Sequence, residues 1–279
     1  MTATVDSFSV ENRTIWVTGS SRGVGFGVGR HLLEQGARVI FHSRNSERLE
    51  DLVSDLGGAP EVTVVSCDVR SPEQVKNAVA EIVRIHGKLD GLVANVGGAS
   101  FGLAAETDPV QWTKMLELNL SASFYCAQAT RRLLVESEIG SVVFVGAVAA
   151  FNPTPMFAGY GAAKAGVEHL VGSLAAEWGP DIRVNAVSPG LILTEGSLAA
   201  VFGGSQDLAD RAGVTTAVGR LGQPSDIGMA CQYLLSPASA FVSGTVLKID
   251  GGAVEGPTQR ILSAVNALKD LPQEARDHQ

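Results

Sequence analysis

The chain has 279 residues, of which 45% are hydrophobic and only 18% are charged, and it contains 32 glycines. This composition is typical of a compact, loop-rich α/β enzyme rather than of a disordered or fibrous protein. The formal net charge of −8 argues against nucleic acid or an anionic membrane as the main partner.

Cysteine and hydropathy patterns bear on the compartment. Cys67, Cys126 and Cys231 are odd in number and far apart, so neither a disulfide framework nor a zinc pattern is predicted. The first residues lack the pattern of a signal peptide, and the most apolar run, at 142–151, is too short to cross a bilayer. We therefore expect a cytoplasmic protein without a membrane partner. The five histidines form no ligand pattern, and no catalytic metal is predicted.

The first chemical signal is a glycine loop. The apolar run TIWV at 14–17 leads into TGSSRGVG at 18–25 and then into a helical pattern that ends near residue 36. Gly19, Gly23 and Gly25 allow positive φ, close approach to a pyrophosphate and tight helix packing. The helix N-terminus would offer free N–H groups to the phosphates. A plain strand-to-helix turn is the alternative.

The next expected strand, at 37–44, bears on the cofactor. A site for NAD usually places a carboxylate at the end of this strand, but the residues here are His42, Ser43 and Arg44, and no acid occurs before Glu47. Arginine binds a 2′-phosphate bidentately, and Arg22 in the loop adds a second charge. The sequence therefore favours NADP, with NAD as the alternative if these arginines are ordinary surface residues.

Strand and helix patterns alternate along the rest of the chain. We expect strands at 61–69, 89–95, 140–148, 181–189 and 245–250, and helices at 46–57, 72–86, 108–136, 159–178 and 224–235. Such alternation implies right-handed crossovers and a parallel sheet. We predict a single α/β domain, a Rossmann-like doubly wound parallel sheet of about seven strands with helices on both faces.

Tyr160 and Lys164 form the candidate catalytic pair. Residues four apart lie on one face of a helix, so the phenol and the ammonium can point at the same spot. A nearby cation favours phenolate, which suits Tyr160 to proton transfer. By itself the pair is also compatible with a solvated helix face.

These motifs together resemble the short-chain dehydrogenase/reductase family over residues 12–252. The resemblance also rests on ANVGG at 94–98, LNL around Asn119, SPGLILT at 188–194, GRLGQPSD at 219–226 and IDGG at 249–252. It implies hydride transfer between a nicotinamide and a carbonyl or alcohol, with Tyr160 as acid/base. Lys164 would lower the pKa of Tyr160 and hold the cofactor ribose, and Asn119 would anchor a water that relays protons. A helix-interior Asn119 bonded to local backbone is the alternative.

The glycine loop and the resemblance together define the expected cofactor contacts. These are Gly19, Ser21, Arg22, Gly23, Val24, Gly25, Ser43, Arg44, Asp68, Val69, Asn95, Gly97, Tyr160, Lys164, Pro189, Gly190, Ile192 and Thr194. The dinucleotide-binding domain is expected at 12–252, followed by a partly helical extension at 253–279. In that extension Ile261, Leu262, Val265 and Leu268 fall on one helical face.

One position departs from the family pattern. The catalytic Ser normally stands thirteen residues before the Tyr, and that position is Ala147, preceded by Gly146. Loss of such a donor typically costs about a hundredfold or more in rate. Asn152 or Thr154 could replace it, or the substrate could carry its own donor. An introduced substitution and non-redox chemistry are further alternatives.

The loops at 97–104, 148–158 and 194–216 are expected to meet the substrate. Their apolar residues are Phe101, Leu103, Phe151, Met156, Phe157, Leu198, Val201 and Phe202. If they line a pocket rather than merely pack, they suit a medium-sized apolar carbonyl compound. Gly203, Gly204 and Gly213 flank a segment that could close over the ligand.

The preferred hypothesis is an NADP-dependent oxidoreductase acting on a carbonyl or secondary alcohol. Because of Ala147, the second is an enzyme of the same fold with lyase, dehydratase or isomerase activity. The third is a catalytically silent NADP-binding protein. The resemblance also implies a homodimer or homotetramer formed through helices around 110–135 and 160–178.

Overall fold

A computed structural model describes residues 7–45, 47–100 and 102–252 of the chain. Seven parallel strands form one sheet in the order β3-β2-β1-β4-β5-β6-β7. The strands are β1 (Thr14–Val17), β2 (Arg38–Ser43), β3 (Val62–Ser66), β4 (Gly91–Ala94), β5 (Ser141–Val145), β6 (Arg183–Pro189) and β7 (Val246–Ile249).

Helices connect successive strands. They are α1 (Gly23–Glu34), α2 (Glu47–Asp55), α3 (Pro72–His86), α4 (Pro109–Leu116), α5 (Ala122–Val135), α6 (Ala158–Trp178), α7 (Glu195–Phe202), α8 (Gln206–Gly213) and α9 (Pro224–Leu235). Short 3-10 turns lie at η1 (Ala104–Glu106), η3 (Val148–Ala150) and η4 (Pro237–Ser239), and a π-helical segment, η2 (Glu117–Ser121), joins α4 to α5.

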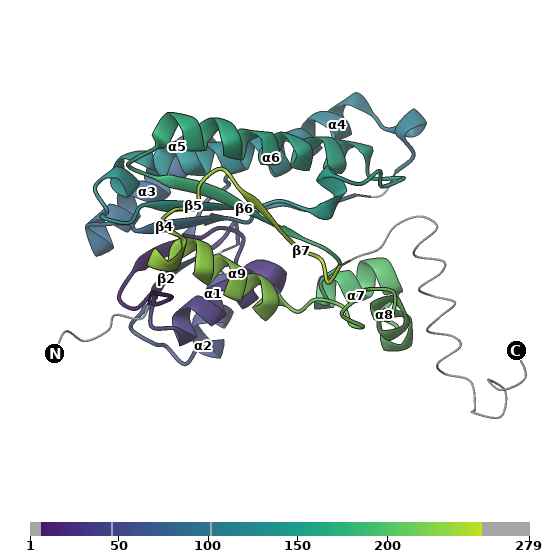
Figure 1. Cartoon of the computed structure of the whole chain (residues 1–279), viewed down its shortest axis with the longest axis horizontal. Helices are drawn as coiled ribbons and strands as arrows, with labels where there is room; N and C mark the ends of the chain where they lie inside the picture. Colours follow the sequence, from purple (N-terminus) through teal and green to yellow (C-terminus); the bar gives the residue numbers. More distant parts are fainter. Residues whose placement is uncertain (1–6, 46, 101, 253–279) are drawn as a thin grey trace, which may run out of the picture.

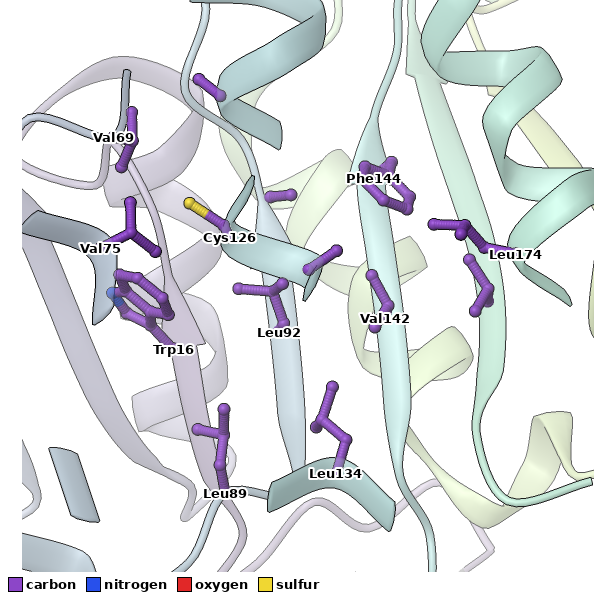
Figure 2. Close-up of a cluster of buried hydrophobic side chains, with 14 of the residues drawn as sticks. Trp16, Val69, Val75, Leu89, Leu92, Cys126, Leu134, Val142, Phe144 and Leu174 are labelled. Carbon is purple, nitrogen blue, oxygen red and sulfur yellow. The ribbon is translucent and has the colours of Figure 1, made fainter. Parts of the chain in front are cut away.

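The sheet is covered on both faces, with α3, α5 and α6 on one and α1, α2 and α9 on the other (Figure 1). Side chains alternate between the two cores because successive strand residues point to opposite faces. Trp16 belongs to the core under α3, α5 and α6, whereas Ile15 and Val17 belong to the core under α1 and α9. Figure 2 shows the first of these cores, in which Trp16, Leu92 and Phe144 come from three different strands. The predicted fold class is confirmed.

The strand order reverses between β1 and β4, which are neighbours in the sheet. In open α/β sheets a ligand binds outside the carboxyl ends of the strands at such a switch point. The loops that leave β1, β2, β4, β5 and β6 all start at this edge because every strand is parallel. The fold therefore gathers the sequence motifs at one edge of the sheet.

One segment differs from the sequence prediction. The expected substrate loop at 194–216 contains the short helices α7 and α8, which pack against each other through Phe202, Ala209 and Leu221. Eight residues are too few for a clear helical period, so the sequence did not separate these helices from a loop. The expected 253–279 extension, with Ile261, Leu262, Val265 and Leu268, lies outside the described residues. The domain boundaries stay a prediction.

A substitution at Gly29 can test how closely α1 packs on the sheet. A Cβ at Gly29 would lie 2.4 Å from Cε1 of Phe41, whose side chain is fully buried. We expect Gly29→Ala to lower the free energy of unfolding by about 1–3 kcal/mol, since overpacking forces neighbours to shift. A Cβ at Gly172 of α6 meets nothing within 4 Å, so Gly172→Ala should raise stability by up to about 1 kcal/mol. Urea unfolding of both variants measures the contrast, and an unchanged Gly29→Ala protein would contradict it.

Candidate functional site

The glycine loop between β1 and α1 has the geometry that its glycines predict. Gly19 and Gly23 have φ values of 63° and 59°, in the left-handed region that favours glycine. A Cβ at Gly25 would lie 2.4 Å from both Gly19 O and Asn95 Nδ2. Asn95 Nδ2 donates to the carbonyls of Thr18 and Gly19, at 3.0 and 3.1 Å. The residue after β4 therefore fixes the loop, and close packing requires glycine at position 25.

The N-terminus of α1 offers its first N–H groups to an anion. Arg22 occupies the N-cap position but makes no side-chain capping hydrogen bond, and the first turn contains no acidic residue. Such N–H groups lack intrahelical acceptors and carry the positive end of the helix dipole. Val24, in the first turn of α1, packs its side chain against the core. This arrangement fits a pyrophosphate.

A cavity of about 400 Å³ lies beside this loop. Nine of the predicted cofactor residues line it, namely Gly19, Ser21, Arg22, Ser43, Arg44, Asp68, Val69, Asn95 and Gly97. The other lining residues, which were not among the predicted cofactor contacts, are His42, Asn45, Arg48, Val96 and Leu118. Arg48 stands in the first turn of α2, and no helical spacing relates it to Arg44, which precedes that helix.

Asp68, the acidic residue that lines this cavity, forms an ion pair with Arg70. Arg70 Nη2 lies 2.5 Å from Asp68 Oδ2, and its hydrogen bonds hold the pKa of Asp68 below the usual range. Asp68 therefore stays ionised, with its charge balanced by Arg70. Arg22, Arg44 and Arg48 line the same cavity, so its remaining charge is positive.

His42 anchors the glycine loop from beneath. The Gly19 N–H donates to His42 Nδ1 at 2.9 Å, and His42 Nε2 lies 3.0 Å from Cys67 O. An accepting Nδ1 and a donating Nε2 define a neutral imidazole. Burial lowers the pKa of His42 to about 4, and the Arg44 charge acts in the same direction, whereas the Cys67 carbonyl and Asp68 oppose it. The histidine is thus a structural link between β2, β3 and the cofactor loop.

The stretch after β6 faces the glycine loop from the other side. Thr194 Cγ2 would lie 3.9 Å from a Cβ on Gly23. The Thr194 hydroxyl accepts from Ser197 N at 3.0 Å and so caps α7. Ile192 is buried and pairs with Gly222 in an isolated bridge. Pro189, Gly190, Ile192 and Thr194 do not line the 400 Å³ cavity, and their contact with a cofactor stays a prediction.

Tyr160 and Lys164 lie in the first turns of α6, as predicted. Lys164 is 2% exposed, and its Nζ donates to Val145 O at 2.7 Å, at the end of β5. The same Nζ lies 5.8 Å from the centre of the Tyr160 ring. Burial lowers the pKa of Lys164 to about 8. The sequence predicted a lowered pKa for Tyr160, but burial raises it to about 12. Desolvation of the phenol is the cause of this upward shift.

Asn119 lies in the π-helical segment between α4 and α5, a type of helix irregularity that is frequent at functional sites. Its Nδ2 donates to the carbonyls of Gly98 and Met115, and its Oδ1 accepts from Gly98 N. A Cβ at Gly97 would lie 2.8 Å from Asn119 Oδ1 and 3.3 Å from Lys164 Nζ. Asn119 and Lys164 therefore both lie next to Gly97, and Asn119 is also bonded to local backbone. Its role in holding a water stays a prediction.

No hydroxyl stands at the usual catalytic serine position. Ala147 is 7% exposed and precedes the η3 turn with an extended backbone. Of the two replacement donors expected from sequence, Thr154 donates its hydroxyl to Asn152 O at 3.0 Å. This bond occupies the Thr154 proton, so Asn152 is the better remaining candidate.

The predicted substrate residues divide into exposed and packed side chains. Leu103, Phe151, Met156 and Val201 are between 43% and 53% exposed. Phe202 is 7% exposed and packs in a cluster with Ala209 and Leu221, and its place in a substrate pocket stays a prediction. Phe157 lies with its ring 6.3 Å from that of Tyr160, and Leu198 is partly buried. Phe101 lies outside the described residues.

The described residues contain no group of three potential metal ligands. Within the same part of the chain, no helix has both the length and the apolar character needed to span a bilayer.

Comparisons with known proteins agree with this architecture. A family model described as Enoyl-(Acyl carrier protein) reductase matches residues 19–254. The Homo sapiens protein "Dehydrogenase/reductase SDR family member 4" is 32% identical over 244 residues, which cover 86% of this chain and 87% of that protein. Galactitol 2-dehydrogenase (L-tagatose-forming) of Cereibacter sphaeroides is 33% identical over 248 residues, which cover 88% and 96%.

A solved structure is similar over nearly the same length. Gluconate 5-dehydrogenase from Burkholderia cenocepacia J2315, in complex with NADP and tartrate, is 30% identical with a TM-score of 0.82. The alignment covers 89% of this chain and 97% of that one. The chain belongs to the short-chain dehydrogenase/reductase family, as its motifs predicted.

The buried neutral His42 makes stability depend on pH. Its folded pKa of about 4 lies below the unfolded value of 6.5, so its contribution is complete above 6.5 and is lost as pH falls toward 4. Between about pH 7 and about pH 5 the free energy of unfolding should fall by about 2 kcal/mol through this group. His42→Asn retains an acceptor for Gly19 without a titrating ring. Urea unfolding should show a smaller pH dependence in this variant, and an equal dependence would contradict the assignment.

Proposed function

We propose that this protein is an NADP-dependent oxidoreductase that transfers hydride between a nicotinamide and a carbonyl or secondary alcohol, with Tyr160 as acid/base. The observation that carries the proposal is the convergence of Tyr160, Lys164 and Asn119 at the edge of the sheet that holds the uncapped α1 N-terminus. That edge is where ligands bind in open α/β sheets.

The chain's residues fit a dinucleotide. The free N–H groups of α1 suit a pyrophosphate, and a Cβ at Gly25 would fill the close-packed turn beside it. Arg22, Arg44 and Arg48 suit a 2′-phosphate, since guanidinium groups bind phosphate bidentately. The NADP complex of the similar gluconate 5-dehydrogenase supports the same choice over NAD.

The nicotinamide would supply or accept the hydride. Tyr160, whose pKa is raised to about 12, holds its proton at neutral pH and is prepared to donate it to a carbonyl oxygen. Charge that develops on the phenolate is then stabilised by the nearby Lys164 ammonium. The exposed side chains of Leu103, Phe151, Met156 and Val201 suit a medium-sized, largely apolar substrate.

A second candidate is non-redox chemistry on the same fold, such as that of a lyase, dehydratase or isomerase. Ala147 favours it, because a site without the usual hydroxyl lacks one of the donors that would bind a substrate carbonyl beside Tyr160. Mass spectrometry of the products separates the two candidates. A net change of two hydrogens identifies redox chemistry, and an unchanged cofactor redox state identifies the alternative.

The reaction is tested by following the absorbance of NADPH, which is consumed when a panel of apolar ketones is reduced. Polyols are assayed with NADP in the oxidative direction, because one relative is a galactitol 2-dehydrogenase. We expect turnover that Tyr160→Phe reduces by about 10²–10⁴-fold, since the variant removes the proton donor. Tyr233, which packs on Phe8 at α9, provides the matched control Tyr233→Phe with unchanged rate. Tight NADPH binding without turnover of any substrate would contradict the proposal.

Cofactor preference is tested by the dissociation constants of NADPH and NADH. Arg44→Ala and Arg48→Ala should each weaken NADPH binding by about tenfold or more and leave NADH binding nearly unchanged, since only NADPH carries the 2′-phosphate. Arg84→Ala, on the exposed surface of α3, is the matched control. An unaltered preference after Arg44→Ala would contradict the assignment of the 2′-phosphate.

The oligomeric state of the protein is also a proposal. The family resemblance favours a homodimer or homotetramer through the helices around 110–135 and 160–178, which correspond to α4, α5 and α6.

A further inference from the structure

A carboxylate that belongs to none of the motifs above lies one helical turn beyond Lys164 on α6. Glu168 stands four residues after Lys164 on α6 and is half-buried. The Ser188 hydroxyl of β6 donates to Glu168 Oε1. The backbone N–H of Ala147 faces the Glu168 carboxylate and favours its anion. The carboxylate therefore lies beside the residue that replaces the usual catalytic serine.

Gly146 makes room for this arrangement. A Cβ at position 146 would lie 2.5 Å from Ser188 Oγ and 2.8 Å from Glu168 Oε1. Both distances are shorter than van der Waals contact allows, so a side chain here would displace the carboxylate or the hydroxyl. The observed arrangement of Glu168 and Ser188 therefore requires glycine at position 146.

Two charged side chains of α6 consequently hold three successive residues at the end of β5. Lys164 Nζ donates to Val145 O at 2.7 Å, Glu168 lies against Gly146, and the Ala147 N–H faces the Glu168 carboxylate. Residues four apart share one helix face, which lets both side chains reach the same strand end. The position of Ala147 relative to Tyr160 is therefore set by α6 itself.

The same carboxylate acts on the charge of Lys164. Burial lowers the pKa of Lys164, and the Glu168 charge opposes that shift. Burial raises the pKa of Glu168, whereas Ser188, the Ala147 N–H, Lys248 of β7 and Lys164 favour its anion. Lys248 and Lys164 are the cations that face Glu168 within the described residues. Neutralising Glu168 should therefore reduce the fraction of Lys164 that is charged.

We propose that Glu168 is a positioning residue, which fixes the backbone at Ala147 and keeps Lys164 in its cationic form beside Tyr160. The proposal rests on the proposed oxidoreductase function, because it assigns Glu168 to the same proton-transfer site.

The test compares Glu168→Gln, which keeps the shape and an acceptor oxygen but removes the charge, with Glu168→Asp, which keeps the charge. With NADPH and an active carbonyl substrate, we expect Glu168→Gln to lower kcat about tenfold while the KM for NADPH stays constant. The alkaline limb of the pH profile of kcat should move to lower pH by about one unit, since Lys164 loses the negative charge of Glu168 that favours its cation. Glu168→Asp should restore the position of that limb. Glu61→Gln, an exposed acid before β3, is the matched control.

Lys164 can also be titrated without turnover, by NMR of ¹³Cε-labelled lysine with the signal assigned through Lys164→Arg. Its midpoint should be lower in Glu168→Gln than in the wild type. Equal midpoints, or a loss of kcat with an unmoved alkaline limb in a folded variant, would reduce Glu168 to a structural role and overturn the proposal. Wild-type protein that turns over no substrate would instead overturn the proposed function. Thermal denaturation confirms that each variant is folded.

Discussion

The burial of the Lys164 ammonium is the constraint on which the rest of the site depends. A cation removed from water is expensive unless it finds partners, and the lysine has Val145 O at 2.7 Å and the Glu168 charge one helical turn away. Its neighbours must then be small. Gly97 and Gly146 each occupy places where a Cβ would meet the polar atoms around the lysine or its counter-charge. One buried charge thus requires glycine at one position in each of two loops that are distant in the chain.

The parallel sheet makes this concentration of groups possible. Seven strands running in one direction bring the loops after β1, β4, β5 and β6 to one edge, and fully buried cores on both faces hold that edge in place. Asn95 and His42 extend the scaffold into the glycine loop by direct hydrogen bonds to its backbone. Polar groups that look like ligand contacts in the sequence therefore also serve to build the site.

Much of the fold could be predicted because its signals are local. The strand–loop–helix pattern around Gly19 and the alternation of strands with helices of ten or more residues both arise from short-range periodicity. Helices α7 and α8 escaped prediction because each has only eight residues, and their stability comes from mutual packing of Phe202 with Ala209 and Leu221. The π-helical segment that carries Asn119 was missed for a related reason, since a single turn of i→i+5 hydrogen bonds leaves no mark on the local pattern of apolar residues.

The sequence by itself determined the family, the strand and helix order, the glycine loop, the Tyr160–Lys164 pair and the missing hydroxyl at Ala147, because each depends on residue type and spacing along the chain. Only the tertiary structure decided that Arg48 joins the arginines of the cavity, that His42 anchors Gly19, and that Glu168 and Ser188 lie behind Gly146. It also reversed the expected pKa shift of Tyr160. Contacts between distant segments and the desolvation of buried groups depend on how the elements pack, and spacing along the chain does not encode them.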